Sequence, residues 1–369
     1  MHLSALLEKA QKARCNLTRA ELLALLKLEG EEELTLLYRG AYEVKTRQVG
    51  KYVGLRGLVE MGNICAKNCR YCGIRRGNTK LERFQLDADA VVRMAEWAYG
   101  EKYGSVVLQS GEIESDEHTE LIAGIVRRIA AFSSGEMGVT LCLGEQSSDV
   151  YRHWRDAGAH RYLLRIETSS PDLYRRLHPA DHSFARRKKC LQILRELDYQ
   201  VGTGVMSGLP GQTAEHLADD IIFFRDMDVD MIGMGPFIPH PDTPLGKNLG
   251  TPPEYLSGQL RTGLKMIAVA RLYLHNVNIA STTALQALAA DGRERGLLAG
   301  ANVIMPNITD AQYRRQYQLY AGKPCLEENA DHCRGCIARR IIGIGEDILW
   351  GKRADSPHYL RRDSMPQIG

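Results

Sequence analysis

Apolar runs that alternate with helical segments are the feature that most constrains the fold of this chain. Eight runs rich in Val, Ile and Leu occur at 54–61, 105–109, 138–143, 161–167, 201–207, 230–235, 277–282 and 301–305. Amphipathic stretches separate them, at 87–99, 117–132, 149–157, 184–197, 213–227 and 253–273. Eight strand–helix units predict an α/β fold, a (β/α)8 TIM barrel rather than an open sheet. Because the last helices are the least clear, six full units with two irregular ones remain an open alternative.

The segments on either side of the predicted barrel differ from it in pattern. Residues 1–50 are interpreted as an N-terminal helical extension, because Thr18 and Glu21 form a capping-box pattern and leucines cluster over residues 22–28. Residues 51–310 form the predicted barrel. Residues 311–369 form a C-terminal extension that contains cysteines. We therefore expect one barrel domain between two extensions.

Composition and charge argue against several classes of protein. The formal net charge is +3 and 44 % of the 369 residues are hydrophobic, which allows a large core and implies no strongly charged partner. The densest basic run, Arg186–Lys189, is interpreted as a solvated helix face rather than a nucleic-acid site. Charges interrupt the apolar N-terminal stretch, and no uncharged apolar run approaches about 18 residues, so we expect neither a signal peptide nor a membrane span.

Cysteine usage indicates the redox environment. The chain has nine cysteines, an odd number, and six of them fall in two tight groups. This distribution argues against a secreted disulfide framework and for a reducing compartment. We therefore expect a cytoplasmic protein with no nucleic-acid and no membrane partner.

The first cysteine group lies within 61–77, directly after the first apolar run. Cys65, Cys69 and Cys72 give it the spacing C-x3-C-x2-C. Iron–sulfur clusters are held by cysteine thiolates. Three thiolates on one loop can bind three irons of a four-iron cluster and leave the fourth iron open to a substrate or cofactor, as in open catalytic metal sites. The spacing therefore favours a 4Fe-4S cluster with one accessible iron.

Two other interpretations of this loop remain open. A structural zinc site needs a fourth ligand, but no further cysteine or histidine lies nearby, and the next histidine is His118. A thioredoxin-like redox pair would use Cys69 and Cys72 alone and leave Cys65 without a role. Cluster binding is preferred to zinc, and zinc to a redox pair.

Polar or glycine-containing clusters follow one predicted strand after another. Chemistry in a TIM barrel takes place at the C-terminal ends of the strands, so we expect these clusters to meet at one mouth. Each cluster alone is weak evidence, since loops are polar in any case. Besides the cysteine loop, the clusters are Gln109–Glu112, Gly144–Glu145, Arg165–Thr168, Ser207–Gln212, Pro236–Pro241, Thr282–Thr283 and Pro306–Asn307.

A second cysteine group near the C-terminus consists of Cys325, Cys333 and Cys336. The preferred interpretation is a second iron–sulfur cluster with a non-protein fourth ligand. A zinc site closed by His332 or a remote residue also remains open, because its ligand types are plausible. A composite zinc ribbon made from the last two cysteines of each group is the least favoured, because the pairs lie far apart in sequence. The other cysteines, expected to be small buried hydrophobes, are Cys15, Cys142 and Cys190.

The pattern C-x3-C-x-aromatic-C, with Tyr71 as its aromatic residue, resembles the signature of the radical S-adenosylmethionine (SAM) enzymes. The resemblance implies that SAM chelates the open iron through its amino and carboxylate groups. An electron from the reduced cluster then cleaves SAM to methionine and a 5′-deoxyadenosyl radical. The implied cofactors are a 4Fe-4S cluster and SAM, with an accessory 2Fe-2S or 4Fe-4S cluster at the second cysteine group.

Within this superfamily, the chain is most similar to the FeFe-hydrogenase maturase family HydE, which shares its architecture with biotin synthase and methylornithine synthase. The similar segments are VLQSGE (107–112), RYLLRIET (161–168), SGLPGQT (207–213), MIGMGPFIPHPDTPL (231–245), ANVIMPN (301–307) and YRRQYQLYAGKPC (313–325). The resemblance implies an adenosyl radical that attacks the sulfur of a cysteine-ligated iron carbonyl cyanide complex during assembly of the diiron subcluster. It also implies three partners: that complex as supplied by the maturase HydG, the scaffold HydF, and an electron donor such as ferredoxin or flavodoxin.

The resemblance further implies roles for individual residues. The radical cluster is held by Cys65, Cys69 and Cys72. SAM contacts Tyr71, Gln109, Ser110, Gly111, Glu167 and Arg187. The substrate pocket deeper in the barrel comprises Arg56, Thr140, Arg161, Thr282, Thr283, Met305, Tyr317 and Tyr320. For the pocket arginines, a buried ion pair within the barrel is an equally open interpretation. Ile166 stands where some family members have histidine, so it is given no role.

Two alternatives to this function remain open. A biotin synthase-like or methylornithine synthase-like enzyme would use the same site to abstract hydrogen from carbon in an organic substrate. A non-enzymatic iron–sulfur carrier would hold clusters yet leave SAM intact in the presence of dithionite.

Overall fold

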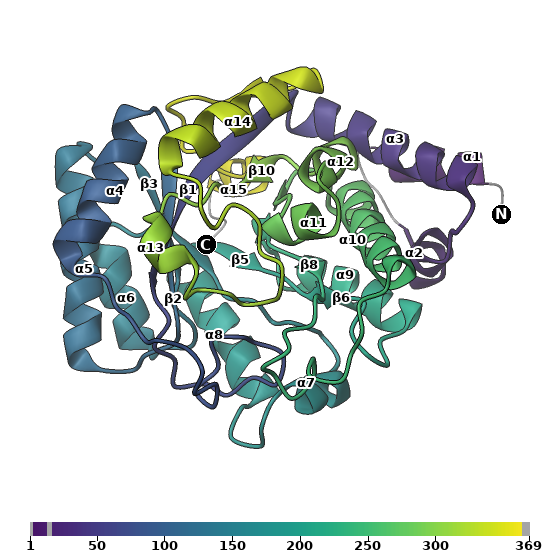
Figure 1. Cartoon of the computed structure of the whole chain (residues 1–369). Coiled ribbons are helices and arrows are strands. Elements are labelled where there is room, and N and C mark those ends of the chain that lie inside the picture. The colour runs from purple at the N-terminus through teal and green to yellow at the C-terminus, as the bar shows by residue number, and fades with distance from the viewer. Residues whose placement is uncertain (1–2, 13–16, 364–369) are drawn as a thin grey trace.

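A computed structural model describes residues 3–12 and 17–363, in which eight parallel strands form a ring with helices outside it (Figure 1). The ring consists of β1 (Tyr52–Gly62), β2 (Ser105–Ser110), β3 (Gly138–Cys142), β4 (Arg161–Leu163), β5 (Gln200–Thr203), β7 (Met231–Ile232), β9 (Asn278–Ile279) and β10 (Val303–Ile304). The strands are adjacent in chain order, and a bridge between Ala280 and Val303 joins β9 to β10. Each strand overlaps one of the eight predicted runs, so the predicted TIM barrel is confirmed.

Helices follow the strands, as the amphipathic stretches predict. They are α4 (Ala88–Gly100), α5 (Asp116–Phe132), α6 (Ser148–Asp156), α7 (Pro171–Leu177), α8 (Phe184–Glu196), α9 (Ala214–Asp226), α10 (Pro253–Leu274), α11 (Thr283–Leu288) and α12 (Gly292–Leu298). The side chains of Asp87, Ser115 and Ser183 accept backbone N–H groups at the starts of α4, α5 and α8. Each cap satisfies a donor that has no partner within its own helix.

Two short strands extend the barrel at its C-terminal end. β6 (Met206–Ser207) and β8 (Gly235–Pro236) follow β5 and β7 and pair with each other in parallel.

Side chains alternate between the two sides of the barrel wall, as the two-residue period of a strand requires. Val53, Leu55 and Val59 of β1 pack into the main apolar core beneath the helices. Arg56 and Glu60, which are also buried, therefore lie on the inner side of the wall. TIM-barrel interiors are dominated by bulky branched side chains, so charged residues here indicate a site rather than packing.

The N-terminal helices α1 (Leu3–Ala10), α2 (Arg19–Leu26) and α3 (Glu31–Gln48) lie against the outside of the barrel, at the right of Figure 1. The predicted capping box of Thr18 and Glu21 is present at the start of α2. α2 packs on α9 and α10, and α3 packs on α10. Lys45 of α3 forms a fully buried ion pair with Glu346. The extension thus contacts both the barrel helices and the tail.

The tail contributes α13 (Ala311–Arg314), α14 (Ala330–Gly343), β11 (Asp347–Ile348) and α15 (Pro357–Asp363). β11 pairs in parallel with the beginning of β1, so the tail adds a strand to the barrel sheet. Between β11 and α15 the backbone passes so close to Gly104 that a Cβ there would collide with Lys352. In Figure 1 α14 crosses the top of the molecule and α15 lies behind the barrel. The part of the tail that begins with β11 therefore covers the N-terminal end of the barrel.

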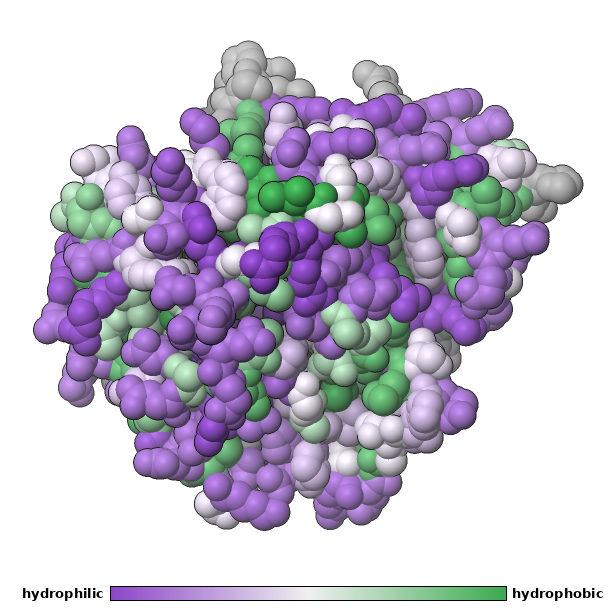
Figure 2. Space-filling view, turned by 45° about the horizontal axis from the view of Figure 1, so that its top comes forward, coloured by the Kyte–Doolittle hydropathy of each residue, from purple (hydrophilic) through white to green (hydrophobic). Residues whose placement is uncertain are grey.

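The surface is mostly hydrophilic in the view of Figure 2, with apolar residues gathered in smaller patches. Among residues 3–12 and 17–363, no helix is long and apolar enough to cross a membrane.

Candidate active site

The first cysteine group lies on a loop at the C-terminal end of β1. Three separate elements hold the backbone of this loop: the segment after β2, the end of α7 and the tail. The hydrogen bonds run from Ala66 N to Glu112 O (2.8 Å), from Arg70 N to Leu177 O (2.9 Å) and from Gly73 N to Leu319 O (2.9 Å). The protein's own contacts therefore shape the loop.

Arg83 adds further hydrogen bonds to the same loop. Its guanidinium donates to the carbonyl oxygens of Asn63 (2.6 Å), Ile74 (2.8 Å), Arg75 (2.7 Å) and Asn78 (3.0 Å). A guanidinium suits this task because its donors form a rigid fork. Burial raises the pKa of the Cys65 thiol, and the charge of Arg83 offsets part of that rise. Arg83 thus supports the loop both sterically and electrostatically.

The three thiols lie near one another and are half-buried. Burial raises the pKa of Cys69 to about 12 and that of Cys72 well above its usual value, and neighbouring thiols add to both rises. Thiolates in this place therefore need a compensating cation. Within the described residues, no group of three or more His, Cys, Asp or Glu side chains converges on a position for a single metal ion. Three soft sulfurs spread along one loop fit three irons of a 4Fe-4S cluster.

The end of β2 lies against the cysteine loop. A Cβ at Gly111 would collide with Cys65, so this close approach requires glycine. The hydroxyl of Ser110 donates to the carbonyl oxygen of Gly111 (2.7 Å), and the side-chain amide of Gln109 donates to the hydroxyl of Tyr317 (3.1 Å). The structure thus places Gln109, Ser110 and Gly111, for which the family resemblance implies a contact with SAM, beside the cysteines.

Glu167 follows β4 with a left-handed backbone, φ 67°. This conformation is uncommon for residues other than glycine and is often found at functional sites. Arg165 holds the carboxylate with hydrogen bonds of 3.1 and 3.0 Å. The charge of Glu167 contributes to the raised pKa of Cys69, although burial is the main cause. The turn therefore brings the Glu167 carboxylate close to the cysteine loop.

Arg187 of α8 lies in a buried network of charges. Its Nε donates to Glu145 at 2.5 Å, and Glu112 lies 3.7 Å from the guanidinium. Lys67 lies 3.0 Å from Glu112 and 3.4 Å from Glu145. Burial alone would lower the pKa of Arg187, but the two carboxylates outweigh it and raise that pKa. The family resemblance implies that Arg187 contacts SAM. The structure adds a network of three charged residues around it, formed by Glu112, Glu145 and Lys67.

The two predicted pocket arginines lie at the closed end of the barrel. Arg161 donates to the carbonyl oxygen of Arg353 (2.9 Å) and lies 3.4 Å from the Asp355 carboxylate. Arg56 donates to the carbonyl oxygen of Ala354 (3.1 Å). Both arginines are fully buried. The ion-pair interpretation therefore describes Arg161, whereas Arg56 contacts the tail only through a carbonyl.

Three buried polar atoms in this part of the lumen have no hydrogen-bond partner within the described residues. They are Nε of Arg56, Nε of Arg161 and Oγ1 of Thr140. A buried donor without a partner costs about 1–3 kcal/mol. Two guanidinium donors and a hydroxyl suit an anionic or strongly polar guest. These atoms therefore support a ligand-binding role for the pocket.

The other predicted pocket residues from the late strands lie at the mouth. Thr282 and Thr283 connect β9 to α11, and Thr283 accepts a hydrogen bond from Arg293 at 2.9 Å. The Thr282 hydroxyl is buried without a partner in the described part of the chain. Met305 directly follows β10.

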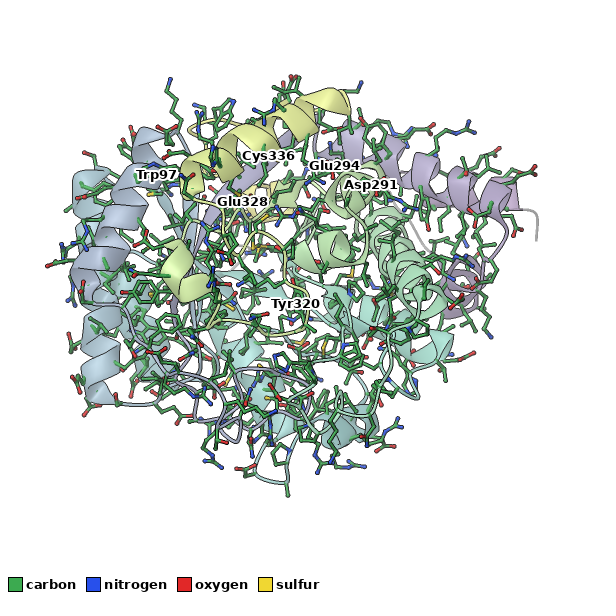
Figure 3. All side chains as sticks on the ribbon, viewed as in Figure 1. Trp97, Asp291, Glu294, Tyr320, Glu328 and Cys336 are labelled. Atoms are coloured by element: carbon green, nitrogen blue, oxygen red, sulfur yellow. The ribbon has the colours of Figure 1, made fainter. Side chains whose placement is uncertain are left out.

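The tail segment Arg315–Lys323, the mouth segment, crosses the open end of the barrel. It passes in front of the barrel in Figure 1, and Tyr320 lies near the centre of the view in Figure 3. Lys323 forms a buried ion pair with Glu60 of β1 and donates to the carbonyl oxygen of Tyr317 (2.9 Å). Tyr317 is buried and Tyr320 half-buried. The mouth segment thus places both predicted tyrosines over the lumen.

The C-terminal cysteines gather where the mouth segment ends. Cys325, which has φ 62°, contacts Cys333 of α14, and a hydrogen bond from the Cys325 thiol lowers the pKa of Cys333. Cys336 lies one turn further along α14, beside Arg340. The first cysteine group lies near α7, on the other side of the mouth in Figure 1, and this arrangement argues against the composite zinc ribbon.

The remaining cysteines differ from one another. Cys190 is buried, as expected. The expectation for Cys142 is wrong, because it is half-buried and ends β3 on the inner side of the barrel, two residues after Thr140. Cys15 lies outside the described residues.

Comparison with known proteins agrees with this geometry. The model of the radical SAM superfamily matches residues 59–224. Together with a barrel that has three cysteines at its mouth, this match defines a radical SAM enzyme, a class that implies a 4Fe-4S cluster and SAM.

The [FeFe] hydrogenase maturase subunit HydE of Thermotoga maritima is 43 % identical over 319 residues, which cover 86 % of this chain and 88 % of that protein. The chain therefore belongs to the HydE family. The 3-methylornithine synthase of Methanosarcina acetivorans is 26 % identical over 77 % of each chain.

Two solved structures share the fold. Methylornithine synthase (PylB) superposes with a TM-score of 0.77 at 24 % identity, covering 94 % of this chain and 98 % of that one. The maturase HydG from Carboxydothermus hydrogenoformans gives 0.75 at 20 % identity, covering 94 % and 79 %.

Sequence reasoning missed Lys67 of the Arg187 network and three further residues of the site: Arg83, Glu60 and Lys323. Arg83 follows the cysteine loop in a stretch without strong pattern, and its partners are backbone carbonyls. Glu60 interrupts the apolar run of β1. A charged residue within a buried strand is the signal that could have marked it as part of the site. Lys323 pairs with Glu60 only because the tail folds back over the mouth.

Proposed function

We propose that this protein acts in the maturation of FeFe hydrogenases as a radical SAM enzyme. The observation that carries the proposal is the position of the three thiols: they lie on one protein-held loop, at the mouth of a barrel with a polar, closed interior. The function in the name of the Thermotoga maritima relative supports the same role.

The cysteine loop serves to hold the cluster and to leave one iron for SAM. Cys65, Cys69 and Cys72 are its ligands, and the bound cluster with SAM supplies a 5′-deoxyadenosyl radical. Tyr71 packs near Leu177 beside the loop and borders the adenine side.

The surrounding residues orient SAM. Gln109, Ser110 and Gly111 meet its methionine end, and Glu167 binds the ribose. Arg187 presents a guanidinium fork, which suits the carboxylate of SAM. The buried carboxylates of Glu112 and Glu145 keep that guanidinium in place.

The lumen binds the substrate and keeps water away from it. We infer that the radical attacks the sulfur of a cysteine-ligated iron carbonyl cyanide complex. Arg56, Arg161 and Thr140 supply unpaired donors at the closed end, which suit anionic cyanide ligands. Thr282, Thr283, Met305, Tyr317 and Tyr320 line the mouth side of the pocket. A closed site prevents side reactions and orients the sulfur toward the radical carbon.

The proposal includes partners and an accessory centre. HydG supplies the iron complex, HydF is the scaffold that receives the product, and a ferredoxin or flavodoxin provides the electron. Cys325, Cys333 and Cys336 hold a second iron–sulfur cluster, which the contact between Cys325 and Cys333 supports.

Tracking the 5′-deoxyadenosyl group tests the sulfur attack. The reconstituted protein is incubated with SAM labelled with ¹³C in the adenosyl group, dithionite and the HydG product. Sulfur attack places the label on sulfur in a thioether. Label found only in free 5′-deoxyadenosine that carries deuterium from a labelled organic substrate would establish the biotin synthase-like alternative. Clusters that form while SAM stays intact would establish the carrier alternative.

A further inference from the structure

The cysteine loop is unusually basic. Residues 61–81 contain five lysines and arginines and no aspartate or glutamate, whereas the whole chain has a net charge of only +3. Arg70 and Arg76 of this loop are exposed and form no ion pair within the described residues. Their charges therefore face solvent directly beside the cluster ligands.

Neighbouring elements add cations at the same place. The backbone of Arg70 donates to Leu177 at the end of α7 and accepts from Leu245 in the loop after β8, with both hydrogen bonds at 2.9 Å. Arg176 precedes Leu177, and Lys247 lies two residues after Leu245. Both cations are exposed and, in the described part of the chain, have no ion pair. We call Arg70, Arg176 and Lys247 the basic patch.

The carboxylates on the elements that carry the basic patch do not cancel its charge. Asp172 pairs with Arg175, and Asp242 pairs with Lys80. Asp181 faces His182, but burial lowers the pKa of that imidazole, so Asp181 keeps its negative charge. The unpaired cations of the patch therefore outweigh one uncompensated carboxylate.

A separate apolar cluster joins the three elements beneath the patch. It is formed by Leu173, Leu177, Met206, Leu209 and Phe237, with Tyr71 and Leu245 packed against it. Figure 1 shows α7 beside the cysteine loop at the lower edge of the molecule. Since this shared packing fixes the backbones next to Arg70, Arg176 and Lys247, the three cations form a surface with a defined shape.

We propose that the basic patch is the docking surface for a small acidic iron–sulfur electron carrier. The inference rests on the proposed function, in which SAM cleavage consumes one electron. Complementary charge steers encounter and fixes orientation, and electron-transfer interfaces are small. Arg70 lies between Cys69 and Tyr71, so a carrier on the patch is one residue from a cluster ligand. One electron passes from the reduced carrier to the oxidised cluster; the carrier is oxidised and the cluster reduced.

The test compares two reductants on the reconstituted protein. SAM cleavage is measured as 5′-deoxyadenosine formed, with dithionite or with a reduced acidic ferredoxin below saturation, at low and at high salt. In Arg70→Glu/Arg176→Glu we expect wild-type rates with dithionite and a rate with ferredoxin at least about tenfold lower at low salt. The wild-type ferredoxin rate falls with salt, and the variant loses this dependence.

Control variants separate the patch from general effects of charge. Arg39→Glu/Arg127→Glu makes the same charge change on α3 and α5 and leaves both rates unchanged. Arg176→Glu/Lys247→Glu leaves the cysteine loop intact and reproduces the loss, so the result does not depend on cluster loading of one variant.

Ferredoxin-driven rates and salt dependence that match the wild type in both patch variants would overturn the docking proposal alone. A wild-type protein that cleaves no SAM even with dithionite would overturn the proposed function, and the docking proposal with it.

Discussion

Asp355 forms an ion pair with Arg161 at the closed end of the barrel, with 3.4 Å between the guanidinium and the carboxylate. The same carboxylate accepts a hydrogen bond from Gln200 at 2.7 Å. Arg161 and Gln200 are direct neighbours in the register of β4 and β5. One tail residue therefore fastens the C-terminal segment to two adjacent strands and positions a pocket arginine.

Asp355→Asn removes the charge that Arg161 faces. We expect the free energy of unfolding to fall by about 3 kcal/mol, the lower end of the range for a broken buried pair, because the Asp355 side chain is 20 % exposed. Denaturant unfolding of the apoprotein measures the change. Asp198→Asn, which breaks an exposed pair with Arg155, is the control and costs less than about 1 kcal/mol. Equal losses in the two variants would contradict the account.

The same pair predicts a pH dependence. Burial alone would raise the pKa of Asp355, but hydrogen bonding to His160 and the charge of Arg161 outweigh it and lower the folded-state pKa below 3.8. A depressed carboxyl pKa contributes stability above the unfolded-state pKa, and this contribution is lost as the pH falls through the folded-state value. The difference between wild type and Asp355→Asn is therefore constant near neutral pH and shrinks below about pH 4. If the difference in unfolding free energy between the two proteins increased at low pH, this prediction would be contradicted.

Arg83→Lys tests the support of the cysteine loop. A lysine keeps the charge but cannot reach four carbonyl oxygens with one ammonium group. We expect the folded conformation of the loop to lose about 1–2 kcal/mol of stability. As a result, a smaller fraction of the protein retains iron and sulfide after reconstitution and desalting. Arg76→Lys is the matched control, because the Arg76 side chain makes no hydrogen bond within the described residues. Full retention in Arg83→Lys would show that the loop needs no such support.

His178 is expected to position Tyr71. Its Nδ1 lies 2.9 Å from the carbonyl oxygen of Tyr174, which can only accept, so Nε2 is the acceptor for the Tyr71 hydroxyl at 3.4 Å. His178→Phe keeps the ring and loses the acceptor, and we expect SAM to bind about 3–10 times more weakly. His178→Gln supplies an acceptor and restores part of the affinity. His118→Phe, a buried histidine on α5, leaves SAM affinity unchanged; the same weakening in both Phe variants would refute a specific role.

The double substitution Cys333→Ser and Cys336→Ser tests the accessory centre. We expect one set of iron signals to disappear while SAM cleavage and hydrogenase activation persist, because the radical site lies across the mouth near α7. Mössbauer spectra and an activation assay with apo-hydrogenase measure the two effects. Complete loss of activation would mean that the C-terminal cysteines take part in the main reaction.

The sequence predicts the barrel because each strand and helix has a local signature. Buried runs such as 105–109 and cap residues such as Asp87 act within a few neighbours, so periodicity locates them. The cysteine loop is equally local, with all three thiols inside eight residues.

The remaining features depend on contacts between distant parts of the chain. β11 has only two residues and pairs with β1, almost 300 positions earlier, so sequence periodicity does not predict it. Lys323 and Asp355 are ordinary charged residues in sequence, and only the return of the tail brings them to Glu60 and Arg161. Pairing between strands or between tail and barrel is set by tertiary packing, which a single sequence does not encode locally.

The most direct test of the central claim is electron paramagnetic resonance of the anaerobically reconstituted, dithionite-reduced protein with and without SAM, performed on Cys333→Ser/Cys336→Ser so that only one cluster contributes. If Cys65, Cys69 and Cys72 leave one iron free for SAM, a reduced 4Fe-4S signal appears and its g values shift when SAM is added. A protein that loads only zinc, or a cluster whose spectrum does not change with SAM, would contradict the account.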